Sequence, residues 1–263
     1  MEEKILFLDR VDSTNLYAKR HFAELEDGAL VAAGEQTAGM GRQGRRWLSP
    51  AGENICASYV MKHVREPYLA TAAASLAVLK TLREYDRDSS YYLKWPNDVY
   101  CGMDKICGIL SEGVLRRGGG GFDGVIAGMG ININSTADTL SGAGHAVSLR
   151  MRTGSVFSVK KVLSSLAKYL SACYIKYLNT PEQMYSEWKA ENLLIGRMLE
   201  FETPDGLKFR AELHDLSRTG DAVLLPADGV VRIFSCGDVR IMKDTWKESE
   251  TKMNIQDQGM KHQ

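Results

Sequence analysis

Between residues 91 and 131 the chain passes through four short β-type segments that are joined by tight turns. The segments are YYLKW, DVYC, KICGILSEGVL and FDGVIAGMGI, separated by PND, GMD and RRGGGG. Turns this short join antiparallel neighbours, because a parallel connection needs a crossover of a dozen or more residues. Earlier in the chain, ILFL, ALVAAGEQT and ICASYVM also have strand character. The spacing therefore predicts a mixed or antiparallel sheet rather than a doubly wound parallel sheet.

Helical patterns lie on both sides of these strands. Capping-type residues in DSTN (12–15) predict a helix that begins there, and Pro67 suits the first turn of a helix running to about Tyr85. An amphipathic pattern predicts a helix over 158–178, and another begins at Pro181. The fold class predicted for this part is α+β, with helices packed on a mixed sheet.

The pattern changes after about Asn192. Close hairpins follow, such as RMLEFET-PDG-LKFRAELHDLS, and no helical periodicity is seen. We predict an α+β domain over 1–191, a small β domain over 192–243 and a polar, disordered tail over 244–263.

Composition excludes several classes of protein. The 33 Lys and Arg residues balance the 33 Asp and Glu residues, so no overall field draws the chain to nucleic acid or to a membrane surface. The acidic N-terminus and its four-residue apolar run do not form a signal peptide. The five cysteines include no C-x-x-C and the five histidines no H-x-x-x-H, which argues for reduced thiols in a cytoplasm and against zinc.

A glycine-rich basic segment, TAGMGRQGRRWLSP, contains G-x-G-x-x-G at Gly39, Gly41 and Gly44. The dinucleotide-binding interpretation fails, because a helix should open after the third glycine and here a strand follows. A solvated basic turn is one alternative. The other is a mobile flap whose arginines, Arg42 and Arg45 among them, close over an anionic ligand with Trp47 as an apolar wall.

Two further polar segments allow both a bland and a functional interpretation. Pro-Asn-Asp in KWPNDV is good turn sequence, yet Lys94, Asn97 and Asp98 together suit a nucleotide with Mg²⁺. Lys105, at the start of KICGILSEG, has the pattern of a solvated edge residue. In GMGININ the glycines allow a ligand to approach the backbone closely, and Asn132 adds a neutral oxygen.

Five segments in this order resemble biotin protein ligases: DSTN (12–15), EQTAGMGRQGRRWLSP (35–50), KWPNDV (94–99), KICGILSEG (105–113) and GMGININ (128–134). The resemblance covers nearly the whole chain. It implies the class II synthetase-like fold of these ligases, with a small SH3-like β-barrel at the C-terminus. By this resemblance the flap is the lid over biotin and its adenylate.

The resemblance also implies the chemistry. The carboxylate of biotin attacks the α-phosphate of ATP, with Mg²⁺ as the metal, and biotinyl-5′-AMP forms. A lysine of a biotin carboxyl carrier domain then takes the biotinyl group, and no tightly bound prosthetic group is needed. Positioning and charge neutralisation are what such an enzyme must supply.

Site residues follow from the matched positions. Lys105 and Arg42 are implied as catalytic residues, and Asp98 and Asn132 as Mg²⁺ ligands. The residues implied for nucleotide binding are Arg42, Arg45, Lys94, Asn97, Asp98, Lys105 and Asn132. Those implied for biotin binding are Ser13, Thr14, Asn15, Gln36, Gly39, Met40, Gly41, Arg42, Trp47, Lys105, Leu110, Gly128 and Gly130.

The chain departs from the pattern of these ligases at several places. Met40 and Gln43 stand where lids of the family often have arginine, so we expect faster release of the adenylate. GAGHAVSL contains no tryptophan to cover adenine, and His145 is only a neighbour there. The chain starts at the catalytic strand without a winged helix-turn-helix, so we expect a monofunctional ligase that does not bind DNA.

Two other functions are kept as alternatives. One is a lipoate-type ligase of the same superfamily, although the Ser-Thr-Asn cluster suits the ureido ring of biotin better than an apolar dithiolane. The other is a non-catalytic module that senses biotin or binds single-stranded nucleic acid through its arginines and Trp47. The partner expected for the ligase is a biotin carboxyl carrier protein or domain, and the chain is expected to be a monomer or a homodimer with no membrane contact.

Overall fold

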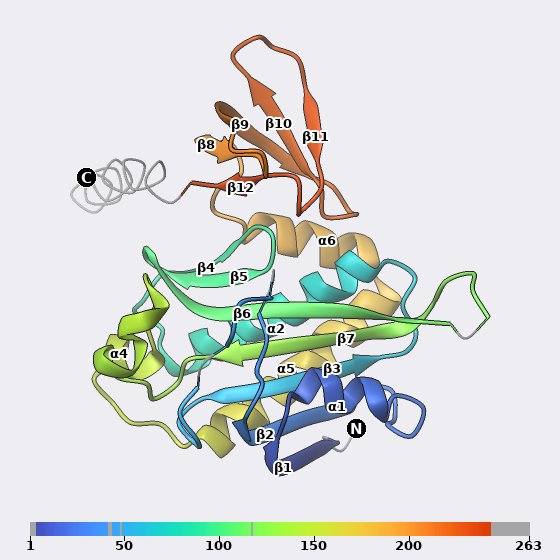
Figure 1. Cartoon of the computed structure of the whole chain (residues 1–263), viewed down its shortest axis with the longest axis vertical. Helices are drawn as coiled ribbons and strands as arrows, with labels where there is room; N and C mark the ends of the chain where they lie inside the picture. The colour runs from blue at the N-terminus through green and yellow to red at the C-terminus, as the bar shows by residue number, and fades with distance from the viewer. Residues whose placement is uncertain (1–3, 42–43, 48, 117, 243–263) are drawn as a thin grey trace. The chain divides into compact units, whose positions relative to one another are not determined.

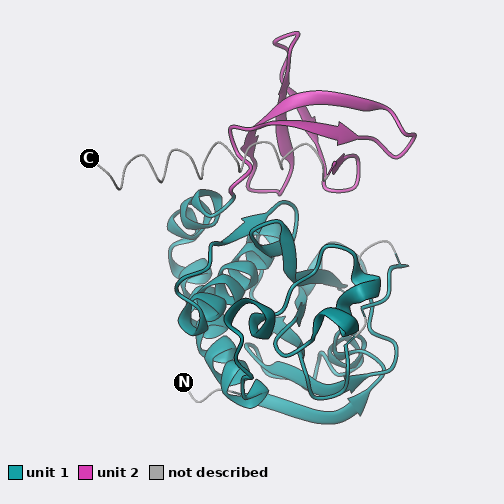
Figure 2. Cartoon of the chain, turned by 90° about the vertical axis from the view of Figure 1, so that its left-hand side faces the viewer, with its two compact units in different colours: residues 1–192 teal, residues 193–263 magenta. Residues whose placement is uncertain are grey.

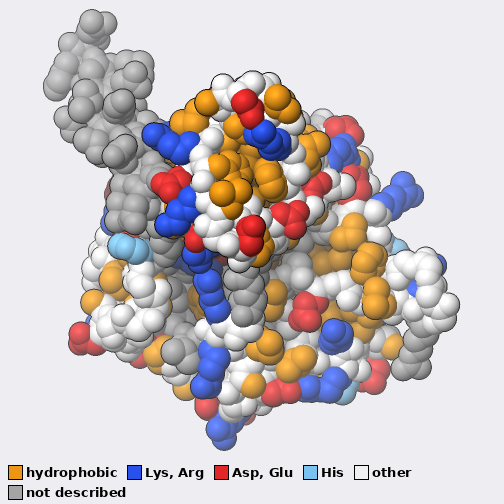
Figure 3. All heavy atoms as spheres, turned by 45° about the horizontal axis from the view of Figure 1, so that its top comes forward, with side chains coloured by type: hydrophobic (Ala, Val, Ile, Leu, Met, Phe, Trp, Pro, Cys, Tyr) orange, Lys and Arg blue, Asp and Glu red, His pale blue; other side chains and the backbone are white. Residues whose placement is uncertain are grey.

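The structure, a computed structural model, describes residues 4–41, 44–47, 49–116 and 118–242. Two compact units make up the chain, residues 1–192 and 193–263 (Figure 2). Charged side chains of both signs are interspersed over the face shown in Figure 3, as expected for equal numbers of basic and acidic residues.

A seven-stranded sheet with the order β1-β2-β3-β7-β6-β5-β4 forms the centre of the first unit (Figure 1). Only β1 and β2 pair in parallel, through the crossover helix α1, and the other neighbours are antiparallel. The predicted mixed sheet is therefore confirmed. Its elements are β1 (Ile5–Val11), α1 (Thr14–Arg20), β2 (Leu30–Gln36), β3 (Ile55–Met61), β4 (Tyr91–Lys94), β5 (Asp98–Cys101), β6 (Asp104–Leu115) and β7 (Phe122–Ile131).

Two long helices, α2 (Pro67–Tyr85) and α5 (Val159–Asn179), cover one face of this sheet, and α6 (Pro181–Ala190) packs beside them. Alternation along β3 sends Tyr59 to this face, where its ring packs edge-on against Tyr174 of α5. Helix α2 begins at Pro67 and buries a run of alanines, so it lies close to the sheet. No helix among the described residues combines the length and apolarity that crossing a membrane requires.

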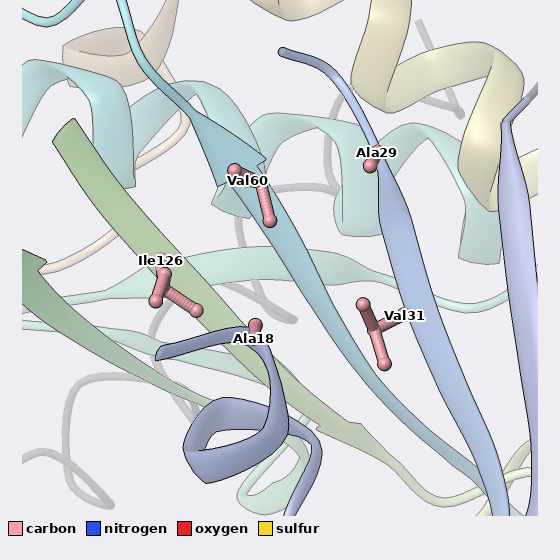
Figure 4. Close-up of a cluster of buried hydrophobic side chains, with 5 residues drawn as sticks. All are labelled: Ala18, Ala29, Val31, Val60 and Ile126. Carbon is pink, nitrogen blue, oxygen red and sulfur yellow. The ribbon is translucent and has the colours of Figure 1, made fainter. Parts of the chain in front are cut away.

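Helix α1 covers one end of the opposite face. It packs Ala18 onto Val31, Val60 and Ile126, which come from β2, β3 and β7 (Figure 4). The helix ends at Arg20, and Phe22, just beyond its end, also packs against this cluster. Because α1 is short, it leaves the part of this face beyond its N-terminal end uncovered by the helix.

Short helices follow β7 that the sequence reading did not predict: α3 (Ala137–Leu140), η2 (Ser141–Ala143) and α4 (Leu149–Thr153). The side chain of Ser148 caps α4 by accepting a hydrogen bond from the backbone N–H of Met151 (3.1 Å). Gly154 ends this helix with φ +74°, a conformation that favours glycine.

The second unit is a five-stranded antiparallel sheet with the order β11-β10-β9-β8-β12. Its inner face buries Leu199, Phe201, Leu213 and Leu224. Among the described residues β11 and β12 remain the two edges, so the predicted small β domain is seen as a sheet and not as a closed barrel. The predicted tail over 244–263 lies outside the described residues. The strands are β8 (Met198–Glu202), β9 (Lys208–Leu216), β10 (Ala222–Pro226), β11 (Arg232–Phe234) and β12 (Arg240–Ile241).

Candidate active site

The register of five strands places predicted site residues in one row on the face beyond α1. Lys94 of β4 pairs with Asp98 of β5, and Asp98 with Gly108 of β6. Gly108 then pairs with Gly130 of β7, and Gly130 with Cys56 of β3. Directly paired residues project to the same face of a sheet. The row therefore brings together segments that are far apart in the sequence.

A second row lies between this one and α1. Leu110 of β6 pairs with Gly128 of β7, which pairs with Ser58 of β3. Three positions in these two rows are glycine. Because glycine has no side chain, a ligand or another side chain can approach the backbone there. We call this surface, made by Gly108, Gly128 and Gly130, the glycine floor.

A β-bulge brings Lys105 onto the same face. Val99 pairs with Cys107, but Tyr100 pairs with Lys105, so β6 contains one extra residue at this point. Without the bulge, strand alternation would send Lys105 to the opposite face from Gly108. In the structure the Nζ of Lys105 lies 2.9 Å from the place of a Cβ on Gly108. The solvated-edge interpretation of this lysine is therefore wrong.

Lys105 and Asp98 form an ion pair, with 2.7 Å between Nζ and Oδ1. Their side chains are 31% and 23% exposed, so both can still reach a ligand. Lys94 is buried and lies over the ring of Tyr100, with its Nζ 5.4 Å from the ring centroid. This end of the row therefore concentrates two cations and one carboxylate, a set suited to an anion with a metal.

Side chains of the lid and of α1 lie directly on the glycine floor. A Cβ on Gly130 would lie 2.2 Å from Cε2 of Trp47, and a Cβ on Gly128 would lie 2.2 Å from Oδ1 of Asn15. The indole Nε1 of Trp47 is buried and has no hydrogen-bond partner among the described residues. Glycine is thus required at both positions for this packing.

Buried polar side chains surround Asn15 at the N-terminal end of α1. The Nδ2 of Asn15 donates to the carbonyl oxygen of Leu110 (3.0 Å) and to Oε2 of Glu112 (3.0 Å). The hydroxyl of Ser58 donates to Oδ1 of Asn15 (2.6 Å) and faces Oγ1 of Thr14 (2.8 Å). The predicted pocket residues Thr14 and Asn15 therefore meet, together with Ser58 and Glu112, which the sequence reading did not single out.

Gln36 extends this group toward the lid. Its Oε1 accepts hydrogen bonds from the backbone N–H (2.7 Å) and the hydroxyl (3.1 Å) of Thr14. Its Nε2 lies 2.9 Å from the place of a Cβ on Gly39. Ser13 is buried as the N-cap residue of α1, where its side chain makes no capping hydrogen bond.

The described parts of the lid on either side of residues 42–43 lie against each other. Met40 forms a bridge with Arg46, and the N–H of Gly41 donates to the carbonyl oxygen of Arg45 (2.6 Å). Met40 and Arg45 are exposed, whereas Trp47 is partly buried. The predicted catalytic residue Arg42 and its neighbour Gln43 lie outside the described residues.

A segment that we call the strap, residues 144–148, holds the backbone of Lys105. The N–H of Lys105 donates to the carbonyl oxygen of His145 (3.1 Å). The N–H of Val147 donates to the carbonyl oxygen of Lys105 (3.0 Å). Asn132 donates from Nδ2 to the carbonyl oxygen of Val147 (3.2 Å). The predicted nucleotide residues Lys105 and Asn132 are therefore linked through a segment that was not predicted to contribute.

Asn54 joins the base of the lid to the end of β7. Its Nδ2 donates to the hydroxyl oxygens of Ser49 (3.2 Å) and Ser135 (2.7 Å), and its Oδ1 accepts from the N–H of Ile133 (2.8 Å). The side chain is almost fully buried. A lone asparagine before a strand gives no sequence signal for such a role.

The described side-chain oxygens of this site are too few to hold a metal ion by themselves, but they suit Mg²⁺ that arrives with a nucleotide. No group of three or more His, Cys, Asp or Glu side chains that could hold a metal occurs among the described residues. Asp98 offers a partly exposed carboxylate, and Asn132, whose side chain is buried just after β7, contributes an amide. Magnesium commonly takes one or two protein oxygens and completes its shell with water and phosphate.

The thiol of Cys56, which pairs with Gly130 in the first row, is buried and not activated. Burial raises the pKa of Cys56, whose neighbours include Ser49, Trp47 and Gln36. A thiol with a raised pKa is a poor nucleophile at neutral pH. Cys56 is therefore not suited to act as a thiolate nucleophile.

Comparison with known proteins gives a consistent result. The model of the biotin/lipoate A/B protein ligase family matches residues 7–132. The biotin–[acetyl-CoA-carboxylase] ligase of Mycobacterium tuberculosis is 30% identical over 219 residues, which cover 81% of this chain and 79% of that protein. The ligase of the same name from Paracoccus denitrificans is 36% identical over 170 residues, which cover 61% of this chain and 68% of that protein.

Among solved structures, biotin protein ligase from Aquifex aeolicus in complex with biotin and ATP has a TM-score of 0.76 and 26% identity, covering 91% of this chain and 99% of that one. The coverage includes both units. The sequence similarity, the shared fold and the ordered motifs agree. The chain therefore belongs to the biotin protein ligases of the biotin/lipoate A/B protein ligase family.

Proposed function

We propose that the glycine floor and the Lys105–Asp98 pair bind biotin and ATP side by side, and that the product is passed to a lysine of a biotin carboxyl carrier domain. As a member of its family, the chain is an ATP-dependent biotin ligase. The observation that carries the assignment of the site is the bulge that turns Lys105 onto the floor beside Asp98.

In the first step an oxygen of the biotin carboxylate forms a bond to the α-phosphorus of ATP, and pyrophosphate leaves. Two anions must approach each other, so the barrier falls when cations neutralise the charge that develops on the phosphoryl oxygens. Lys105 supplies such a cation, and Asp98 fixes the position of its Nζ (2.7 Å). The strap holds the backbone of Lys105 and so limits its movement.

In the second step the neutral amine of the acceptor lysine attacks the carbonyl carbon of the mixed anhydride, and AMP leaves. The anhydride must be shielded from water until the acceptor arrives. Trp47 already lies against Gly130 and supplies an apolar cover. Arg42 and Arg45 are assigned to contacts with the nucleotide on the strength of their place in the lid.

For the metal, we assign Asp98 and Asn132 as the residues that contact Mg²⁺ with its nucleotide. A Mg²⁺ ion held there would neutralise charge on the phosphate oxygens. The pairing of Asn132 Nδ2 with Val147 directs the amide oxygen away from the strap. Lys94 and Asn97, at the two ends of the β4–β5 turn, are assigned to the nucleotide as well.

We further infer that the second unit is the SH3-like module of these ligases, supported by its short antiparallel strands and the buried Leu199, Phe201 and Leu213. The names of the Mycobacterium tuberculosis and Paracoccus denitrificans relatives support acetyl-CoA carboxylase as the source of the carrier domain. The free thiols of the described cysteines suit the reducing cytoplasm.

Biotin-dependent exchange of radiolabelled pyrophosphate into ATP tests this proposal. The unaltered chain should catalyse exchange with biotin and not with lipoate, and Lys105→Ala should lower the exchange rate about 10²- to 10³-fold, as the loss of one charge-stabilising donor does. Lys80→Ala is the matched control, because Lys80 pairs with Glu187 on the helical side. Equal exchange rates for Lys105→Ala and Lys80→Ala would refute the role of Lys105, and lipoate-dependent exchange would favour the alternative ligase.

A further inference from the structure

The amide of Asn15 is held by protein groups on both of its ends. Its two N–H groups are used by the carbonyl oxygen of Leu110 and by Glu112, and its oxygen accepts from Ser58. The side chain itself is buried, at 6% exposure. This amide has one favoured orientation, because a flip would oppose its oxygen to the carbonyl oxygen of Leu110 and the carboxylate of Glu112, which can only accept.

The direction of these hydrogen bonds is set by groups that can act in only one way. A carbonyl oxygen and a carboxylate only accept, so the partners of Nδ2 keep Oδ1 turned toward Ser58 and the glycine floor. At the other end of the group the backbone N–H of Thr14 only donates, which fixes Oε1 of Gln36 as the acceptor and turns Nε2 of Gln36 toward Gly39. The pocket therefore presents an acceptor over Gly128 and a donor beside the lid.

We propose that Glu112 and Ser58 are positioning residues that hold Asn15 in this orientation, so that the pocket selects a head group in which an N–H donor and a C=O acceptor lie close together, as in a cyclic urea. This inference rests on the proposed function of the same site. Glu112 acts on the head group only through Asn15, from whose Nδ2 it accepts a hydrogen bond. Lys19 of α1 lies 3.6 Å from its other carboxylate oxygen and keeps the carboxylate in place.

A purely structural role would have a different signature. If Glu112 only tethered α1 to the sheet, its loss would loosen the pocket for every ligand alike. If Glu112 orients Asn15, its loss weakens ligands that carry the urea and spares ligands that share only the acyl chain. Glutamine at this position keeps an acceptor oxygen, so it should rescue the second role.

The test measures dissociation constants by calorimetry for biotin, dethiobiotin and octanoate, beside the KM and kcat of pyrophosphate exchange. Dethiobiotin keeps the urea, and octanoate keeps only a chain and a carboxylate. For Glu112→Ala we expect the Kd of biotin and dethiobiotin and the KM for biotin to rise roughly 5- to 10-fold, the cost of about one hydrogen bond, with kcat within about twofold. The Kd of octanoate should not change, and Glu112→Gln should restore biotin binding to within about threefold.

Two further variants complete the experiment. Ser58→Ala should act in the same direction as Glu112→Ala, and Glu24→Ala, which removes an exposed carboxylate paired with His21, should leave every constant unchanged. The inference is overturned if Glu112→Ala binds biotin as tightly as the unaltered chain, or if biotin and octanoate weaken equally and glutamine does not rescue. An unaltered chain that binds biotin without supporting exchange would refute the proposed activity, and the calorimetric comparison would still decide the role of Glu112.

Discussion

Replacement of Gly130 by alanine tests whether the glycine floor is needed for ligand binding. The new methyl group would lie 2.2 Å from Cε2 and 2.5 Å from Cζ2 of Trp47, so the ring must withdraw by about 1.2 Å to reach the 3.4 Å of ordinary contact. Overpacking of this kind costs roughly 1–3 kcal/mol. The cost falls on the lid and on any ligand at the floor, and it corresponds to roughly a 5- to 150-fold loss of affinity for biotin.

The stability of the fold should not fall in the same variant. Gly130 pairs regularly within β7, where alanine is favoured over glycine by about 0.5–1 kcal/mol, and the colliding atoms belong to a side chain that can move. Two controls bracket this result. A Cβ on Gly124 would lie 2.3 Å from the backbone oxygen of Met61, so Gly124→Ala should lower stability, whereas a Cβ on Gly142 meets nothing within 4 Å and Gly142→Ala should change neither property.

Calorimetric titration with biotin and urea denaturation measure the two effects separately. Gly130→Ala should lose affinity at unchanged or slightly higher free energy of unfolding, and Gly124→Ala should show the reverse. The reasoning fails if Gly130→Ala binds biotin with the affinity of the unaltered chain, because the floor would then tolerate the methyl group. It also fails if affinity and stability fall together.

Three further predictions concern the lid, its base and α1. Met40 is 53% exposed in the lid. Met40→Arg should slow the release of biotinyl-5′-AMP in a filter-binding assay, because arginine adds a cation that can bind phosphate. An unchanged release rate would contradict the expected effect of the missing arginines. Asn54→Ala should lower the free energy of unfolding by about 1–3 kcal/mol in urea titrations, because the buried N–H of Ile133 loses its acceptor, and a smaller change would mean that water replaces the amide. The hydrogen bonds from Arg20 lower the pKa of the Asp12 carboxyl from 3.8 to about 2. The stabilisation from this pair should therefore be complete above about pH 4 and be lost as the pH falls toward 2. A titration of the Asp12 carboxyl by NMR with its midpoint near about 4 would disprove this.

Short-range patterns in the sequence were enough to predict the strands and most of the helices. The two-to-three-residue turns after Lys94 and Cys101 allow only antiparallel neighbours, and the structure has them. The strand-helix-strand order at the N-terminus likewise corresponds to the parallel β1–β2 pair. The brief α4 was missed, although Ser148 and Gly154 carry ordinary capping signals, because only one helical turn separates them.

The geometry of the site was less accessible to sequence reasoning. A single extra residue in β6 decides which face Lys105 occupies, and no propensity marks a bulge at that position. Ser58 and Glu112 have the alternation of ordinary strand residues, and their relation to Asn15 exists only after three distant segments meet. The catalytic and binding roles assigned to the site residues all stay predictions, and Arg42 lies outside the described residues.

The alanines of α2 have a consequence for the opposite side of the sheet. Ala70, Ala73 and Ala77 are almost fully buried in the helix that packs behind β6 and β7. Because alanine side chains are small, the helix can pack closely against its neighbours. Closely packed interiors transmit strain from one element to the next. A larger residue in this buried helix would have to displace the elements packed on it, β6 and β7 among them, and so deform the ligand cradle without touching it. Variants that alter substrate affinity are therefore to be sought in the rear layer of the molecule as well as around the pocket.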